Sequence, residues 1–174
     1  MTPFHIVLHE PEQPGNTANI GRTCMVGGAH LHLIQPLGFI LSDKMIKRAG
    51  MDYWDRLDKT LYLDWEDFKE KNPGVRIWYA TTKAEQSYTD VEFKPGDYIM
   101  FGAESAGIPE EILREHPERC IRIPMMEGER SMNLSNSVAV VLYEALRQND
   151  FAGLEKQGEL HGDIKWSDVE HAGA

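Results

Sequence analysis

Side chains that could bind a ligand are concentrated at residues 121–146, IRIPMMEGERSMNLSNSVAVVLYEAL. A strand-like run ends at Pro124, a polar loop follows, and a helix is expected to begin within the run Ser-Met-Asn-Leu-Ser-Asn. An ordinary Ser or Asn cap at the start of that helix would use one side chain. The run offers four such groups, namely Ser131, Asn133, Ser135 and Asn136. The surplus indicates a ligand-binding loop in front of the helix.

The predicted helix has two different faces. On a helical wheel that starts at Leu134, four apolar residues share one narrow face that suits core packing: Val138, Val141, Leu142 and Ala145. A mixed stripe occupies the opposite side: Asn136, Val140, Tyr143 and Arg147. A helix of this kind is expected to contact the core on one side and a second partner on the other.

Two further polar segments could contribute to the same site. Arg22 follows Asn16 and Asn19 at intervals of three in the first predicted helix. Taken alone, Arg22 is most simply a surface arginine, but this grouping favours a functional role. Glu104 lies in the glycine-bounded segment GAESAGIP at residues 102–109. Because a buried carboxylate is costly, the simplest alternative is that Glu104 faces water or caps the next helix.

Alternating strands and helices must position these segments. Apolar runs predict strands over residues 4–9, 31–35, 60–63, 75–80, 98–101 and 120–123. Further helices are expected over residues 16–25, 42–50, 65–71 and 110–115, with Asn16 and Asp64 as N-caps. This order predicts an α/β fold with a mainly parallel sheet flanked by helices. Ligands bind beyond the carboxyl ends of such strands, so residues 10–16, 102–109 and 124–133 should converge on one site.

Length and composition narrow the function classes. The 174 residues predict one domain over residues 1–152 and a polar, flexible tail over residues 153–174. The net charge of −10 argues against nonspecific coating of nucleic acid, although a local basic patch is compatible with it. Cys24 and Cys120 have no metal-ligand spacing and the seven histidines are scattered, so no metal is expected. No segment suggests secretion or membrane spanning, which predicts a cytoplasmic protein without a membrane partner.

Several nucleotide-binding and hydrolase motifs are missing from the sequence. No GxGxxG follows a strand and no GxxxxGK[ST] is present, so a conventional dinucleotide fold or nucleoside triphosphatase is not supported. Ser105 is not at the centre of a GxSxG, and no histidine follows in a suitable place. A serine hydrolase is therefore a weak alternative.

Three motifs resemble those of the SPOUT superfamily of knotted RNA methyltransferases. PGNTANIGRTC at residues 14–24 is similar to the first motif, and FGAESAGIP at 101–109 to the second. IRIPM at 121–125, with SMNLSNSVAVVLYE at 131–144, is similar to the third. Within the superfamily, the small size and the run SMNLSN most resemble the enzymes that methylate the wobble-nucleotide ribose of tRNA. Ala18 departs from the glycine that close relatives often carry.

The resemblance implies a C-terminal deep trefoil knot. It also implies that S-adenosyl-L-methionine is the methyl donor, that the protein binds it largely through backbone groups, and that no metal takes part. It implies that five residues bind the cofactor: Ala80, Gly102, Ile123, Ser131 and Asn133. It implies that five others form the catalytic group: Arg22, Asn16, Asn19, Glu104 and Tyr143. Because guanidinium is a poor base, an electrostatic and positioning role is favoured for Arg22 at the acceptor phosphate or 2′-hydroxyl.

The resemblance also implies a homodimer with tRNA as substrate and an acceptor site shared between subunits. The mixed stripe of the last helix is then a candidate partner surface. Eight basic residues are candidates for contacting RNA: Arg22, Lys44, Lys47, Arg48, Lys83, Arg122, Arg130 and Arg147. Two alternatives remain, a knotted 2′-O-methyltransferase for another tRNA position or ribosomal RNA, and a non-catalytic RNA-binding knotted dimer.

Overall fold

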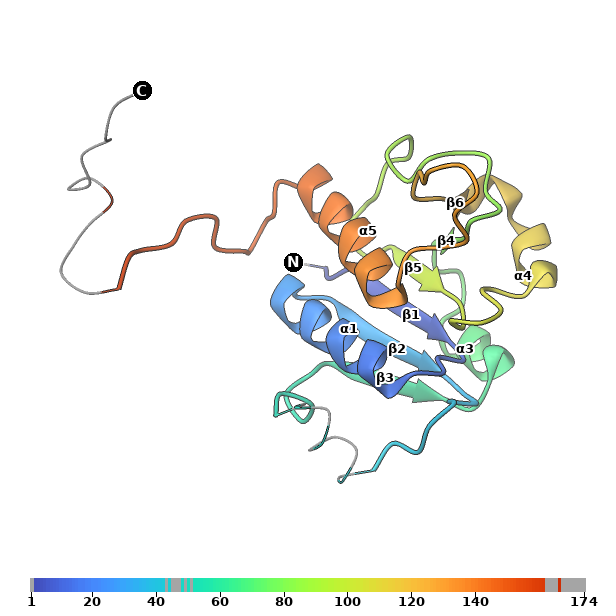
Figure 1. The fold of residues 1–174 in the computed structure, drawn as a ribbon, viewed down its shortest axis with the longest axis horizontal. Coiled ribbons are helices and arrows are strands. Elements are labelled where there is room, and N and C mark those ends of the chain that lie inside the picture. Colours follow the sequence, from blue (N-terminus) through green and yellow to red (C-terminus); the bar gives the residue numbers. More distant parts are fainter. Residues whose placement is uncertain are drawn as a thin grey trace.

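The centre of the fold is a six-stranded sheet in which all strand pairs of the described residues are parallel (Figure 1). The computed structural model describes residues 2–42, 44, 48, 50, 52–161 and 166. The strands are β1 (His5–His9), β2 (His30–Ile34), β3 (Lys59–Tyr62), β4 (Ile77–Ala80), β5 (Tyr98–Phe101) and β6 (Cys120–Ile121). Their spatial order is β3-β2-β1-β5-β4-β6. The predicted α/β fold with a mainly parallel sheet is confirmed.

The register of the sheet aligns the carboxyl ends of four strands. Leu8 of β1 and Ala80 of β4 are both paired with Phe101 of β5. Ala80 is also paired with Ile121 of β6. The segments that follow these strands therefore begin side by side at one edge of the sheet, which is where ligands of parallel sheets bind.

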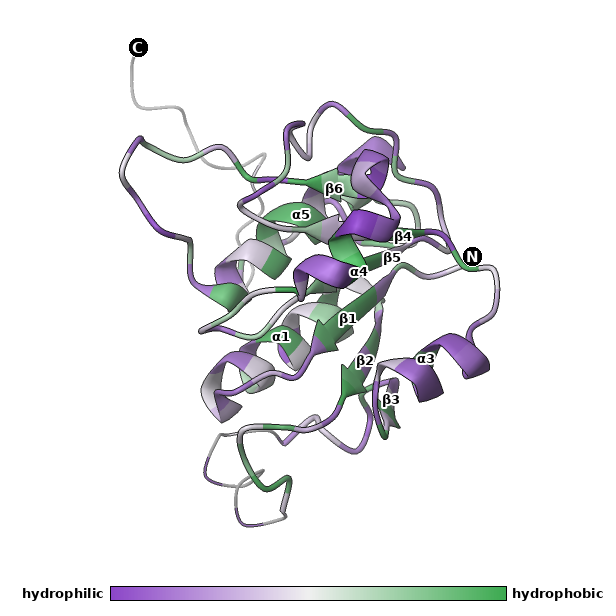
Figure 2. Ribbon diagram, turned by 90° about the vertical axis from the view of Figure 1, so that its right-hand side faces the viewer, coloured by the Kyte–Doolittle hydropathy of each residue, from purple (hydrophilic) through white to green (hydrophobic). Residues whose placement is uncertain are grey.

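Helices cover both faces of the sheet (Figure 1). The helices α1 (Pro14–Gly27) and α5 (Leu134–Gln148) pack against each other on one face. The other face is covered by α3 (Trp65–Lys71) and α4 (Glu110–Glu115), and the 3-10 turn η1 (Pro117–Arg119) precedes β6. Figure 2 shows apolar strands and strongly polar α3 and α4 helices, as expected for helices with one solvent-facing side.

The helices α1 and α5 run in the same direction, with both N-termini at the edge where the polar segments begin. At these N-termini the Asn133 amide donates to Asn16 Oδ1 at 3.1 Å. Near their other ends a Cβ atom at Gly27 would lie 3.2 Å from Leu142 Cδ2, so the two helices pack closely there. The apolar face predicted for α5 is confirmed, because its residues are buried: Val138, Val141, Leu142 and Ala145.

The start of α1 differs from the prediction. The helix begins at Pro14 with Gln13 as its N-cap residue, so the predicted N-cap role of Asn16 is wrong. Proline is favoured at the first helical position because its ring presets φ and no N–H is needed there. Asp64 does cap α3, accepting the Asp67 N–H at 2.8 Å. The helix predicted over residues 42–50 lies largely outside the described residues.

Beyond α5 the chain leaves the body of the protein. Phe151 and Leu154 still pack against the core, and the following residues extend away from the sheet (Figure 1). The boundary predicted between residues 152 and 153 stays a prediction. No helix in the described part of the chain is long and apolar enough to cross a membrane.

Candidate functional site

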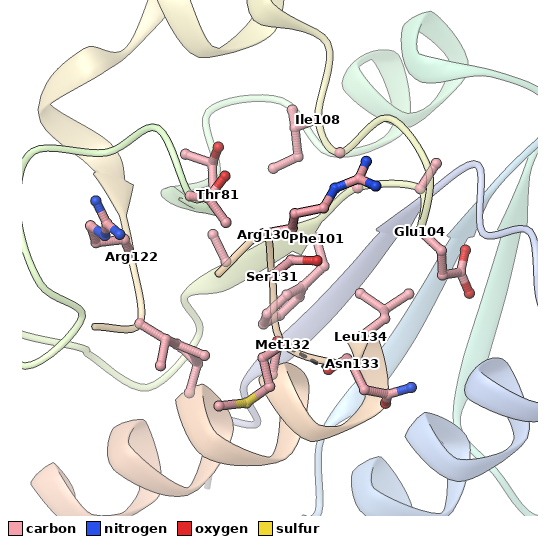
Figure 3. Close-up of a pocket in the computed structure, with 18 of the residues that line it drawn as sticks. Thr81, Phe101, Glu104, Ile108, Arg122, Arg130, Ser131, Met132, Asn133 and Leu134 are labelled. Atoms are coloured by element: carbon pink, nitrogen blue, oxygen red, sulfur yellow. Dashed lines mark hydrogen bonds between the residues drawn. The ribbon is translucent and has the colours of Figure 1, made fainter. Parts of the chain in front are cut away.

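A cavity of about 700 Å³ lies at the carboxyl ends of β4, β5 and β6. Its walls come from residues 80–83, 101–108 and parts of 121–134, together with the first turns of α1 and α5. Figure 3 shows side chains from these segments around one opening. The predicted convergence of the three polar segments is therefore confirmed, and the cavity has the size of a small-molecule site.

The predicted site residues divide between this cavity and the outer helix surface. All five residues predicted to bind the cofactor line the cavity: Ala80, Gly102, Ile123, Ser131 and Asn133. Of the predicted catalytic residues, Asn16 and Glu104 line it as well. The other three, Arg22, Asn19 and Tyr143, are exposed on α1 and α5 outside it. The roles of all ten residues stay predictions.

Side-chain hydrogen bonds connect the three sequence motifs at the cavity. The Asn133 amide donates to Asn16 Oδ1 at 3.1 Å, and the Asn16 amide donates to Glu104 Oε1 at 3.0 Å. Asn133 is also the N-cap of α5, because its Oδ1 accepts the N–H groups of Ser135 and Asn136 at 2.9 and 3.3 Å. Asn133 is thus a helix cap and a link to the first motif at once, and the Ser135 hydroxyl also donates to its Oδ1 at 2.7 Å.

Two glutamates exchange hydrogen bonds between the segments after β1 and β5. The Glu104 carboxylate accepts the backbone N–H groups of Glu12 and Gln13 at 2.7 and 3.2 Å. In return, the Glu12 carboxylate accepts the Ser105 hydroxyl at 2.6 Å and the Ser105 N–H at 2.8 Å. These bonds from Ser105 lower the pKa of Glu12. The role of Glu12 was not predicted, since only the meeting of the two segments reveals it.

The segment after β5 turns back on itself at two glycines. A Cβ atom at residue 102 would lie 1.9 Å from the carbonyl carbon of Gly107. The Gly107 N–H donates to the Ala103 carbonyl at 2.8 Å, and Gly107 has φ +72°, a region that favours glycine. Backbone therefore forms this wall of the cavity. Such a wall fits a cofactor held largely through backbone N–H and C=O groups.

Arg22 lies on the outer surface of α1. Its side chain is 57% exposed, and Nη2 is 3.3 Å from Asp52 Oδ1. The guanidinium lies over the Tyr53 ring, 4.6 Å from its centroid, and the Tyr53 hydroxyl donates to the Ala18 carbonyl. Tyr53 thereby holds Arg22 in place without directing it into the cavity of its own chain.

The segment after β4 also lines the cavity, although it was not among the segments predicted to converge. Thr81, Thr82, Lys83 and Tyr88 contribute to the wall. The sequence feature that could have predicted this is the polar run Thr-Thr-Lys directly after an apolar strand. The other three segments were predicted from the same pattern.

The exchange Glu104→Gln is expected to loosen the junction of the motifs. Glu104 accepts three N–H groups, whereas a glutamine amide would turn its own N–H₂ group toward at least one of these donors. An unsatisfied donor costs roughly 1 kcal/mol at a partly exposed position. We expect a thermal midpoint about 2–4 °C lower, because that is the effect of about 1 kcal/mol in a protein of this size. We also expect weaker binding of S-adenosylmethionine by calorimetry.

The control for this exchange is Glu115→Gln on α4, where the carboxylate is exposed. It should leave both the thermal midpoint and the cofactor affinity unchanged. Unchanged values for Glu104→Gln would contradict a structural role of the Glu104 hydrogen bonds.

The known proteins that this chain resembles in sequence and structure include several RNA methyltransferases. The chain matches the SpoU rRNA Methylase family over residues 3–143. The tRNA (cytidine(34)-2′-O)-methyltransferase of Methylovorus glucosotrophus is 48% identical over 151 residues, covering 86% of this chain and 98% of the relative. A structure described as giving insights into the 2-OH methylation of C/U34 on tRNA has a TM-score of 0.80 and 43% identity, covering 86% of this chain and 98% of its own. An AdoMet-bound rRNA methyltransferase from Sinorhizobium meliloti has a TM-score of 0.72 and 26% identity, covering 83% of this chain and 56% of its own.

Proposed function

Because the chain belongs to the SpoU rRNA methylase family, we propose that it is a tRNA (cytidine/uridine) 2′-O-methyltransferase that modifies the ribose of nucleotide 34. The relative from Methylovorus glucosotrophus, of which the chain covers 98%, is named for this activity on cytidine 34. One structural observation carries the proposal. The cavity brings together the three motifs of the resemblance and all five residues expected to bind the cofactor.

The cofactor of this reaction, S-adenosylmethionine, supplies a methyl group already activated on a sulfonium. The protein has to place a ribose 2′-hydroxyl in line with that methyl group and help its proton to leave. The backbone wall at Gly102, directly after the strand next to that of Ala80, suits the cofactor because neither residue brings a large side chain to the cavity. Asn16 and Glu104 hold the start of α1 beside the cavity, and α1 carries Arg22.

In this proposal Arg22 acts at the cavity of a second subunit. Its exposed guanidinium lies outside the cavity of its own chain. The same helix layer exposes apolar side chains, with Val26 59% and Tyr143 39% accessible, which supports a homodimer that covers them. At the partner's cavity a guanidinium would stabilise negative charge developing on the 2′-oxygen. A monomer in sedimentation at assay concentrations would contradict the shared site.

The C-terminal deep trefoil knot belongs to the same proposal. Residues 122–133 leave an edge strand, line the cavity beside the segments after β4 and β5, and lead into α5 near the middle of the sheet. Threaded connections are very rare in proteins, so the support for a knot comes from the family to which the chain belongs.

Titration calorimetry with S-adenosylmethionine tests the enzymatic part of the proposal. We expect saturable binding by the full chain, with one cofactor for each subunit. A chain with no measurable affinity would instead fit the non-catalytic RNA-binding dimer. A methyl group placed in ribosomal RNA or at another tRNA nucleotide would support the alternative substrate and contradict the assignment to nucleotide 34.

A further inference from the structure

The cavity of this acidic protein carries uncompensated positive charge. The chain has a net charge of −10, yet one carboxylate and three cations line the cavity: Glu104, Lys83, Arg122 and Arg130. The Glu104 carboxylate accepts three N–H groups from residues 12–16, at and just before the start of α1. Lys83 is paired with Glu110 at 2.8 Å. The charge that remains for a ligand is therefore that of Arg122 and Arg130.

These two arginines differ from other candidates for contacting RNA. Neither Arg122 nor Arg130 has a side-chain hydrogen bond or ion pair with any residue that the structure describes. Arg22 is instead paired with Asp52 at 3.3 Å, and Arg147 with Glu144 at 2.8 Å. Two unpaired guanidinium groups at the mouth of a cavity create a local positive potential that favours an anionic partner.

The position of the two arginines suits the backbone of a nucleic acid. Arg122 directly follows β6 and is half-buried, whereas Arg130 is exposed shortly before α5, so they stand at the two ends of one segment. Figure 3 shows them at separate points around the opening. A ribose whose 2′-hydroxyl reaches the cavity brings its 5′ and 3′ phosphates to this rim. Guanidinium groups match phosphate oxygens in geometry as well as in charge.

A neighbouring cavity of about 640 Å³ offers a less suitable path for phosphates. It shares Thr81 and Lys83 with the first cavity. Its lining has three carboxylates, Glu85, Glu110 and Glu118, against two cations, Lys83 and Arg114, and both cations are paired with Glu110. The negative carboxylates repel the negative phosphates of RNA, so the RNA backbone is expected to avoid this cavity.

We propose that Arg122 and Arg130 bind the two phosphates that flank the methylated nucleotide. This proposal rests on the proposed function, because it takes the polynucleotide substrate from there. Phosphate contacts position a nucleic acid without reading its bases. The two arginines would therefore set the location of the ribose, while the choice of tRNA is made elsewhere.

The variants Arg122→Gln and Arg130→Gln in the full chain test the proposal. Each should weaken tRNA binding about tenfold, the usual effect of losing one charged hydrogen bond. Each should also lower the slope of log affinity against log salt concentration by about one, as expected for one lost phosphate contact. Calorimetry should give an unchanged affinity for S-adenosylmethionine. The control is Arg56→Gln, an exposed arginine before β3 and outside the cavity, which should change none of these values.

Three results would overturn the proposal. An unchanged tRNA affinity and salt slope in both folded variants would show that the arginines do not contact phosphates. A loss of S-adenosylmethionine affinity with intact tRNA binding would assign them to the cofactor carboxylate. An equal loss of tRNA affinity in Arg56→Gln would show that the effect comes from the change in net charge and not from contacts of Arg122 and Arg130. If the wild-type protein binds tRNA through these arginines but does not methylate nucleotide 34, the proposed function fails while the phosphate-binding surface stands.

Discussion

Replacing Arg22 with alanine is expected to lower kcat for tRNA methylation by about 10²–10³-fold, the usual loss for one group that stabilises developing charge. The affinity for S-adenosylmethionine should stay nearly unchanged, because Arg22 lies outside the cavity that the predicted cofactor residues line. Single-turnover methylation of tRNA and calorimetry with the cofactor measure the two quantities separately.

The loss of activity in Arg22→Ala should not come from unfolding. The ion pair between Arg22 and Asp52 is solvent-exposed, with side-chain accessibilities of 57% and 84%. Such pairs contribute roughly 0–1 kcal/mol, and an exposed contact with an aromatic ring such as Tyr53 adds about as much. The thermal midpoint of the variant should therefore fall by only a few degrees.

Two companion variants sharpen the test of Arg22. Arg22→Lys keeps the charge but loses the planar fork, so it should retain part of the activity. Mixing Arg22→Ala with Gly102→Ala, a variant in which we expect no cofactor binding, should restore activity if each site combines the cavity of one subunit with Arg22 of the other. Loss of cofactor binding in Arg22→Ala would contradict the assigned role, and absence of restoration in mixed dimers would contradict the shared site.

The second large effect is expected for Gly102→Ala. The added Cβ atom would lie 1.9 Å from the Gly107 carbonyl carbon and 2.1 Å from the Ile108 nitrogen, and both are backbone atoms that cannot rotate away. The hydrogen bond from the Gly107 N–H to the Ala103 carbonyl must then open. Overpacking of this kind costs about 3 kcal/mol or more. We expect a thermal midpoint lower by about 6 °C or more and no measurable binding of S-adenosylmethionine.

The matched control for Gly102→Ala is Gly15→Ala in the first turn of α1. A Cβ atom there meets nothing within 4 Å, and alanine has a higher helix propensity than glycine. The control should keep cofactor binding and be slightly more stable than the wild type. Wild-type stability together with wild-type cofactor affinity in Gly102→Ala would contradict the backbone wall described for the cavity.

Local patterns in the sequence were sufficient to predict most of the fold. Apolar runs predicted all six strands to within a few residues, and the spacing of Val138, Val141 and Leu142 predicted the buried face of α5. The convergence of polar segments followed from the parallel sheet alone. These features depend on neighbours in the sequence and on the general geometry of such sheets, so they can be read without a structure.

The contacts between the segments could not be predicted in the same way. Asn16 had the residue type and position of a helix cap, but its amide bonds to Glu104, 88 residues away. The hydrogen bond from Ser105 to Glu12 and the contact of Arg22 with the Tyr53 ring also join distant parts of the chain. No local pattern encodes these pairs, because each depends on which segments the sheet order brings together.

Methylation of total tRNA by the purified protein, followed by mass mapping of the product at nucleotide resolution, tests the central claim most directly. The tRNA should come from cells that lack this modification, and the only additions should be the protein and S-adenosylmethionine. We expect one methyl group on the ribose 2′-oxygen of nucleotide 34, in a subset of tRNAs with cytidine or modified uridine at that position. A methyl group on a base, on another nucleotide or on no tRNA would contradict the claim.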